Sequence, residues 1–206
     1  ADDVQPDLRS AALAVLERHW RPEGYTCPNA ERYPWQWLWD SCFHAIAWAA
    51  AGDERAVVEL ATCFAGQDSS GFVPHMGYQR DPGHHASFWG RAGWSSITQP
   101  PMYGHAAAEL VARGVDVPDA VLDSATAGLR FLLDRRRRSA GGLVELVHPW
   151  ESGADDSLRW DDLVDATDRR ARKGELLAAV RRDVVGAPVA NDLFPVGAAS
   201  FNALVA

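Results

Sequence analysis

The chain of 206 residues is acidic and nearly half apolar, and these two properties limit the classes of protein to which it can belong. It carries 28 acidic and 20 basic residues, a net charge of −8 at pH 7, and 47% of its residues are hydrophobic. So large an apolar fraction predicts a packed core and excludes a disordered chain. The acidic balance disfavours a nucleic-acid partner, because phosphate binding needs a clustered basic face. The one basic run, residues 135–138, follows a helical pattern and predicts a solvated helix end.

The cysteines and the hydropathy pattern bear on the compartment. No apolar run approaches the roughly 20 residues that span a bilayer, so we expect no membrane partner. The first residues are acidic and lack the apolar region of a secretory signal. The three cysteines, Cys27, Cys42 and Cys63, are odd in number and show no metal spacing. Together these features predict a reducing cytoplasm, with Cys42 and Cys63 as core thiols.

The hydrophobic pattern is helical along most of the chain, and no region alternates in the manner of a sustained strand. In chain order, the expected helices span residues 7–19, 40–51, 54–64, 101–113, 119–135 and 168–182, and another begins over 200–206. Segments 66–96 and 147–162 are rich in Gly, Pro and aromatic residues, and loops this long are usually functional. The order of two helices followed by a loop rich in aromatic and polar residues recurs along the chain. It predicts an all-α fold of stacked helical pairs, arranged as a solenoid or a ring.

Aromatic and polar residues gather just before two of the expected helices. Tryptophans at 35, 37 and 39 precede Asp40. Asp40 is a candidate helix cap, but a carboxylate beside flat rings also suits a sugar, whose faces stack on aromatics. Gln99 precedes Pro100-Pro101. Its amide would bond either the loop backbone or a pair of hydroxyls.

A third segment, residues 148–161, combines carboxylates and tryptophans around Gly153. It reads His-Pro-Trp-Glu-Ser-Gly-Ala-Asp-Asp-Ser-Leu-Arg-Trp-Asp. Glycoside hydrolysis uses one carboxyl group to protonate the leaving oxygen and a second to activate water or attack carbon. The alternative, a calcium-like or acidic surface turn, fits poorly because no glutamate closes an EF-hand loop at its twelfth position. We expect Arg159 to pair with a carboxylate of this loop.

Taken together and in this order, the three segments resemble a known family. They are similar to mannosylglycerate and glucosylglycerate hydrolases, which are grouped with processing α-glucosidases in glycoside hydrolase family 63, and to trehalases. The matching motifs are Trp39-Asp40, Gln99-Pro100-Pro101 and Glu151 to Asp155. The resemblance covers roughly residues 8–165. It implies an (α/α)6 toroid of the six-hairpin glycosidase type, of which residues 1–206 form the N-terminal portion of a single domain.

The resemblance also implies roles for individual residues. Asp155, the fifth residue of Glu-Ser-Gly-x-Asp, would be the general acid of an inverting glycoside hydrolase, with a pKa raised by burial near Trp150 and Trp160. The implied substrate-binding residues are Tyr33, Trp39, Asp40, Phe43, Gln99 and Gly153. Tyr78 would lie nearer the aglycone. The implied substrate is a small α-glycoside such as glucosylglycerate or mannosylglycerate. An α-glucosidase or trehalase-type hydrolase and a non-catalytic sugar-binding fragment remain alternatives.

The chain departs from this family in one respect. The family's general base lies on the last hairpin, and no segment here matches it. We therefore expect a fragment that is inactive alone, that binds a small carbohydrate, and that self-associates or needs a missing C-terminal half. No nucleotide loop or zinc pattern is present, so we expect no cofactor and no metal. His75, His84 and His85 are expected to be solvated or capping residues.

Overall fold

The computed structural model describes residues 7–164 and 168–206, and helices make up most of its regular structure. In chain order the elements are α1 (Leu8–His19), β1 (Trp20–Arg21), β2 (Tyr25–Thr26), β3 (Gln36–Trp37), α2 (Leu38–Ala51), α3 (Arg55–Thr62), β4 (Met76–Gly77), α4 (Ala86–Trp89), α5 (Met102–Ala112), α6 (Asp119–Asp134), the 3-10 helices η1 (Pro149–Ser152) and η2 (Leu158–Trp160), α7 (Arg169–Ala178), β5 (Arg181–Arg182), β6 (Pro188–Ala190) and α8 (Ala199–Val205). Every helix predicted from periodicity is present. The last long one ends at Ala178, four residues short of the predicted end, and the chain continues into β5.

The strands and the short helices were not predicted. The strands form three two-stranded antiparallel sheets, β1–β2, β3–β4 and β5–β6. Each strand is only two or three residues long, which is too short for a pattern of alternation to be visible. The β3–β4 pair has a structural consequence, because it ties the chain just before α2 to the middle of the long loop over 66–101.

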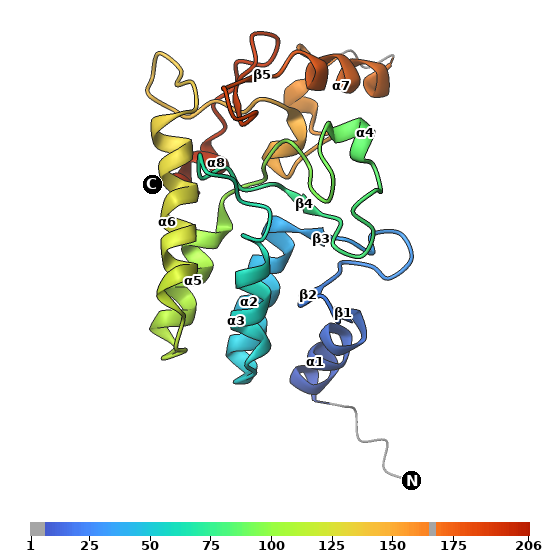
Figure 1. Ribbon diagram of the computed structural model, residues 1–206, viewed down its shortest axis with the longest axis vertical. Coiled ribbons are helices and arrows are strands. Elements are labelled where there is room, and N and C mark those ends of the chain that lie inside the picture. The colour runs from blue at the N-terminus through green and yellow to red at the C-terminus, as the bar shows by residue number, and fades with distance from the viewer. Residues whose placement is uncertain (1–6, 165–167) are drawn as a thin grey trace.

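Four helices form the framework beneath the loops. In Figure 1 α2, α3, α5 and α6 lie side by side, and the loops over 66–101 and 147–164 gather at one end of them. On α2 the buried residues recur at helical spacing, as in Leu38, Cys42, Ala45, Trp48 and Ala49. Gly52, with φ of 76°, ends α2 in the left-handed conformation and lets α3 fold back as a hairpin.

A second core lies under the C-terminal part of the chain. Phe131 at the end of α6, Trp160, Leu176 on α7, Phe194 and Phe201 on α8 are buried together there. Burial also confirms the expectation for the thiols, since Cys42 and Cys63 lie in the first core and all three cysteines are free. Among the described helices, none is both long and apolar enough to cross a bilayer.

The prediction of a solvated helix end at residues 135–138 is confirmed for Arg135 and Arg138, which are exposed, and is wrong for Arg136. Arg136 is only 4% exposed, and its guanidinium lies 2.6 Å from the Glu151 carboxylate. Arg135 pairs with Asp183 at 2.9 Å, and Arg137 is also ion-paired. The reason is that α6 ends at Asp134 and the chain then turns between the two cores, where the cations meet carboxylates distant in sequence.

Candidate active site

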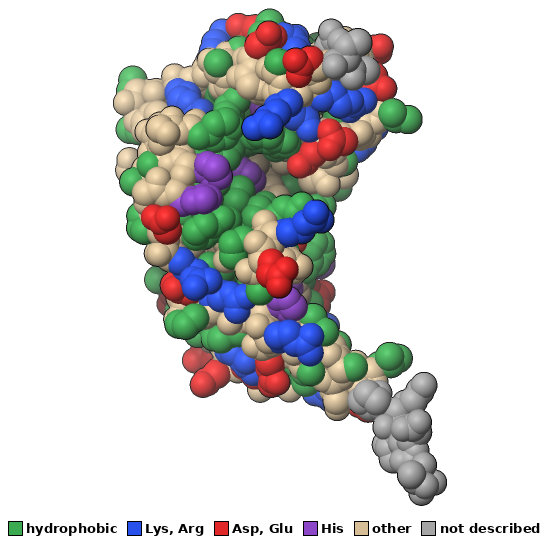
Figure 2. Space-filling view, turned by 90° about the vertical axis from the view of Figure 1, so that its right-hand side faces the viewer, with side chains coloured by type: hydrophobic (Ala, Val, Ile, Leu, Met, Phe, Trp, Pro, Cys, Tyr) green, Lys and Arg blue, Asp and Glu red, His purple; other side chains and the backbone are tan. Residues whose placement is uncertain are grey.

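Two adjoining cavities open where the motif loops meet. The smaller, of about 270 Å³, is lined by Pro28, Tyr33, Trp37, Trp39, Asp40, Gln99, Gly153 and Asp155. The larger, of about 890 Å³, shares Tyr33, Trp37, Gln99 and Asp155 with it. Figure 2 shows a face that is hollowed beside a group of histidines, with hydrophobic side chains in the hollow and Lys or Arg side chains around it. Asp155 therefore lies at the junction of the two cavities.

The structure brings together all but one of the residues that the sequence singled out. The smaller cavity is lined by six of them: Tyr33, Trp39, Asp40, Gln99, Gly153 and Asp155. Phe43 lines neither cavity, because it lies one turn further along α2, is 49% exposed, and packs its ring against that of Trp39 with centroids 5.9 Å apart. Their roles toward a substrate stay predictions, but three loops distant in sequence converge as expected.

Asp155 lies on the loop between η1 and η2, where the residue is exposed to solvent although neighbouring groups partly desolvate its carboxyl group. Burial is the main cause that raises its pKa above the ordinary value of an aspartate, and Asp156 raises it further. Lys173 lowers it, but the Lys173 ammonium is also held 2.7 Å from the Asp156 carboxylate. Of the two tryptophans expected to bury Asp155, Trp150 lines the larger cavity, whereas Trp160 packs in the core under the loop. A carboxyl group that keeps its proton at higher pH is what a general acid requires.

Gly153 lets the Asp155 loop approach the first motif closely. Its φ is +69°, and a Cβ built there would lie 2.5 Å from the Trp39 ring. A side chain at this position would therefore be strained by its backbone conformation and would collide with the indole. The glycine at this point of the motif allows Trp39 to form one wall of the smaller cavity.

Gln99 joins the first motif to the second. Its Oε1 accepts a hydrogen bond of 3.3 Å from the backbone N–H of Trp39. The amide NH2 group is the end left to donate to a ligand, and Gln99 lines both cavities. Both sequence interpretations of Gln99 are thus compatible with its position: one end of the amide bonds backbone, and the residue faces the site.

Asp40 is the second carboxyl group of the smaller cavity. It lies in the first turn of α2, whose N-cap is Trp37, so the interpretation of Asp40 as a helix cap is wrong. Helix α2 begins two residues earlier than predicted because β3 runs directly into it. Burial raises the pKa of Asp40, while the nearby His44 lowers it. Two carboxyl groups with raised pKa values thus line one cavity, a combination that recurs at catalytic centres.

The larger cavity has an aromatic wall and a cationic rim. The wall includes Trp35, Tyr78, His84, His85, Phe88, Trp89 and Trp150. The Trp89 indole N–H donates to the Tyr78 hydroxyl at 2.8 Å, which fixes both rings. The cations on the rim are Arg32, Arg169, Arg170 and Lys173. Lys173 and Arg169 have carboxylate partners in Asp156 and Asp161, and the described residues offer no such partner to Arg32 or Arg170.

The histidines differ from one another. His84 and His85 line the larger cavity with ring centroids 4.1 Å apart. The expectation of a solvated or capping residue is wrong for His75, which is 5% exposed, with Nδ1 2.6 Å from the Ser95 hydroxyl. His75 directly precedes β4, and its backbone is held by hydrogen bonds to Leu38 and Ile97, which keeps it in the interior. Over residues 7–164 and 168–206, no group of three or more His, Cys, Asp and Glu side chains could hold a metal ion.

Sequence reasoning missed several residues around the site. Lys173 on α7 contacts the Asp156 carboxylate from 17 residues away, and Arg136 binds the Glu151 carboxylate from 15 residues away. No local pattern signals either contact, because each joins separate elements. Arg159 does not pair with a loop carboxylate as expected; it donates to the Ser157 hydroxyl at 3.1 Å and lies over the Trp160 ring. The described carboxylates near that ring are turned toward Lys173 and Arg169 instead.

The curated proteins to which the chain is similar are hydrolases. The mannosylglycerate hydrolase of Thermus thermophilus is 37% identical over 73% of this chain and 40% of its own length. The glucosylglycerate hydrolase of Mycolicibacterium hassiacum is 36% identical over 63% of this chain and 34% of its own. The chain thus spans between about a third and two fifths of the length of these curated relatives.

Solved structures agree with the sequences. A crystal structure of the family 63 mannosylglycerate hydrolase from Thermus thermophilus in complex with glucose superposes with a TM-score of 0.69, at 34% identity, over 84% of this chain and 47% of that one. The complex of that enzyme with Tris and D-glycerate gives a TM-score of 0.67 at 36% identity, over 77% of this chain and 40% of that one. The predicted fold, part of an (α/α)6 toroid, is confirmed. The family described as "Mannosylglycerate hydrolase MGH1-like glycoside hydrolase domain" matches residues 33–206. The chain therefore belongs to this family of glycoside hydrolases.

Proposed function

We propose that this chain supplies the general acid and the sugar-binding subsite of an inverting hydrolase of a small α-glycoside, such as glucosylglycerate or mannosylglycerate. The observation that carries the proposal is the position of Asp155. It lies where the two cavities join, and its pKa is raised chiefly by burial. A glycosidic oxygen at that junction would receive the Asp155 proton as the bond to the sugar carbon breaks, so that the oxygen of the aglycone leaves as a hydroxyl group and not as an alkoxide.

The smaller cavity suits the glycosyl ring. Trp39 offers a flat face, Asp40 accepts hydrogen bonds from hydroxyls, and the Gln99 amide donates to them. Tyr33 lines both cavities and would contact the sugar on the side of the aglycone. The general base of the inverting reaction is not assigned to any residue of this chain, and we propose that residues 1–206 form the N-terminal portion of the catalytic domain, which becomes active with a C-terminal half or a partner chain.

The larger cavity favours an anionic aglycone over a second neutral sugar. Arg32 and Arg170 lie on its rim and enter no ion pair with the described residues, and an anion in the cavity would lie next to both cations. A carboxylate binds a guanidinium with charge-assisted hydrogen bonds. Trehalose and simple glucosides carry no such charge. Glycerate glycosides are therefore the better fit, and the relatives named for them point in the same direction.

Calorimetric titration of the chain with a set of glycosides tests the proposal. Mannosylglycerate, glucosylglycerate, trehalose and methyl α-glucoside differ in charge while sharing an α-linked hexose. We expect the two glycerate glycosides to bind most tightly, and their advantage to shrink as salt rises, since ion pairing is screened. The Asp155→Asn variant should keep this binding and lose any turnover. Preference for trehalose, or equal affinity for all four, would contradict an anionic aglycone; no saturable binding by the parent would contradict the proposal as a whole.

The compartment belongs to the same proposal. Cys27, Cys42 and Cys63 are free and buried thiols. Thiols persist in a reducing compartment, so we propose that the enzyme acts in the cytoplasm.

A further inference from the structure

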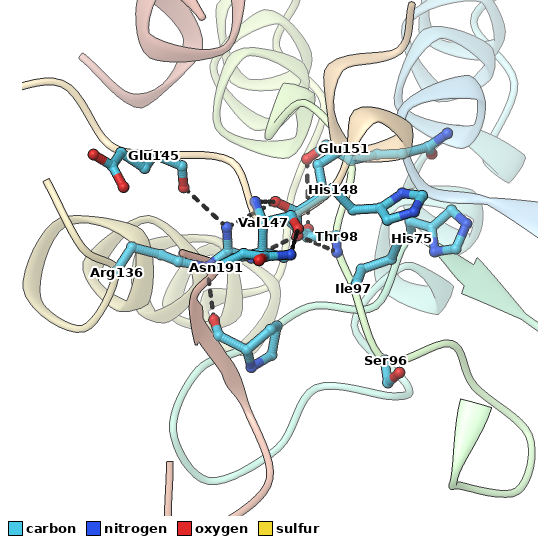
Figure 3. Close-up of polar contacts among 12 residues, drawn as sticks. His75, Ser96, Ile97, Thr98, Arg136, Glu145, Val147, His148, Glu151 and Asn191 are labelled. Carbon is cyan, nitrogen blue, oxygen red and sulfur yellow. Dashed lines mark hydrogen bonds and ion pairs between the residues drawn. The ribbon is translucent and has the colours of Figure 1, made fainter. Parts of the chain in front are cut away.

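A fully buried carboxylate connects the elements that carry the site. Glu151 begins the motif that ends at Asp155, and it is 0% exposed. Its Oε1 accepts from the Thr98 backbone N–H at 3.0 Å and from Arg136 Nη2 at 2.6 Å. Its Oε2 accepts from the Val147 backbone N–H at 2.9 Å and from Arg136 Nη1 at 2.7 Å. Each oxygen thus binds one backbone N–H and one guanidinium N–H, as Figure 3 shows.

Arg136 is equally committed to the fold. Besides the two bonds to Glu151, its Nε donates to the Pro188 carbonyl at 2.7 Å and its Nη1 to the Glu145 carbonyl at 3.2 Å. Its side chain is 0% exposed in the ion pair. The guanidinium therefore fixes the carboxylate against the backbone of β6 and of Glu145, which lies between α6 and η1. Bidentate pairing of this kind sets direction as well as distance.

One of the two backbone N–H groups bound by Glu151, that of Thr98, lies next to the site. Thr98 precedes Gln99, whose amide faces both cavities. From Glu151 to Asp155 the chain is short and internally bonded: the Ser152 hydroxyl donates to the Pro149 carbonyl at 2.6 Å and accepts from the Ala154 N–H at 3.0 Å. A displacement of Glu151 is thus transmitted along bonded backbone to Gln99 in one direction and to Asp155 in the other.

We propose that the buried Arg136–Glu151 ion pair is the positioning unit that holds Asp155 and Gln99 at the junction of the two cavities. Neither member lines a cavity. The carboxylate of Glu151 accepts four hydrogen bonds already, which leaves it no capacity for a substrate hydroxyl. The pair thus acts through its neighbours. The consequence of the ion pair for glycoside binding rests on the proposed function, but its effect on the geometry of the loops does not.

The test compares three variants by NMR titration of the Asp155 carboxyl group and by chemical denaturation. In Glu151→Gln an NH2 group replaces one oxygen, so two of the four donors lose their acceptor. We expect the loop to loosen and Asp155, which is already exposed on one side, to lose neighbours that desolvate its carboxyl group. Because burial is the main cause of its raised pKa, the titration midpoint of Asp155 should fall toward the ordinary aspartate value. Arg136→Lys keeps the charge without the fork and should shift the midpoint in the same direction by less.

Glu59→Gln is the matched control. Glu59 is also 0% exposed, and it accepts from the Thr26 N–H at 2.8 Å, the Thr26 hydroxyl at 2.6 Å and the Trp48 indole at 3.2 Å. It contacts α2 near Asp40, but neither Glu59 nor these partners lie in the loops of Gln99 and Asp155, and Glu59 is not among the causes of the Asp155 pKa shift. We expect Glu59→Gln to lower stability and leave the Asp155 titration unchanged. The proposal is overturned if Glu151→Gln and Arg136→Lys also lower stability without moving that midpoint, because the pair would then be structural only. Since this readout needs no ligand, it decides the matter even where no glycoside binds.

Discussion

A methyl group at position 153 would show whether Trp39 is held against the loop of Asp155. Gly153 has φ of +69°, and a Cβ there would lie 2.5 Å from one atom of the Trp39 six-membered ring and 2.8 Å from two others. Carbon atoms in contact sit about 3.5–4.0 Å apart, so the ring would have to withdraw by about 1 Å. Withdrawal would move Trp39, one wall of the smaller cavity, away from the other residues that line this cavity, including Asp155.

The expected cost of Gly153→Ala has two parts. Left-handed backbone costs a residue with a Cβ about 1–2 kcal/mol. Overpacking the contact adds about 1–3 kcal/mol. The chain offers a control that separates them: Gly52 has φ of +76° and nothing within 4 Å of a built Cβ. Gly52→Ala should therefore cost only the backbone part, about 1–2 kcal/mol.

Urea denaturation of both variants gives the two free energies of unfolding, and calorimetric titration with mannosylglycerate gives the affinity. We expect Gly153→Ala to be less stable than Gly52→Ala by about 1–3 kcal/mol. We also expect it to lose roughly tenfold or more in affinity, the equivalent of about 1.4 kcal/mol of displaced contact. Gly52→Ala, at the far end of α2, should bind as the parent does. Equal stability losses together with unchanged affinity in both variants would refute the close contact between Trp39 and Gly153.

Three further predictions concern charge. The pKa of Asp155 is raised, so its ionised form costs folding free energy once the pH exceeds the unfolded pKa of about 3.9. We therefore expect Asp155→Asn to be more stable than the parent at pH 7 and not at pH 3. Chemical denaturation at both pH values measures this, and no gain in stability at pH 7 would contradict it. Because Lys173 lowers the pKa of Asp155, Lys173→Met should raise the Asp155 midpoint in an NMR titration, and a fall would be the wrong sign. Burial lowers the pKa of His148 to about 4, so the stability it confers is complete above its unfolded pKa of about 6.5 and is lost as the pH falls to about 4, a loss of about 3 kcal/mol. The pH dependence of unfolding between 6.5 and 4 should accordingly be flatter in His148→Gln, and an unchanged slope would count against a buried neutral His148.

Periodicity and motif order were sufficient to predict the helices and the convergence of the motif loops. Helices such as α2 and α6 are long enough for one apolar face to be read from spacing. Asp40, Gln99 and Asp155 could be placed together because each stands in a recognisable motif before or between helices. The capping assignment of Asp40 was wrong because β3, which pairs with β4 about 40 residues away, runs directly into α2 and starts the helix before Asp40.

Other features depend on contacts that leave no local trace. Strands of two residues form only because β3 and β4 are brought together by the helices. A run of four basic residues predicts solvation on average, yet Arg136 alone of that run meets Glu151 in the interior. Lys173 modifies the charge environment of Asp155 from a helix in another part of the chain. Such long-range pairing of charges is set by tertiary packing, which hydropathy does not encode.

A crystal structure of the Asp155→Asn variant with intact mannosylglycerate would test the central claim most directly. The account predicts the hexose ring in the smaller cavity against Trp39 and Asp40, and the glycerate in the larger one toward Arg32 and Arg170. The glycosidic oxygen should lie at the junction, within about 2.6–3.2 Å of the side chain at position 155. A sugar bound elsewhere, or a glycosidic oxygen beyond reach of that side chain, would contradict the assignment of Asp155 as the proton donor.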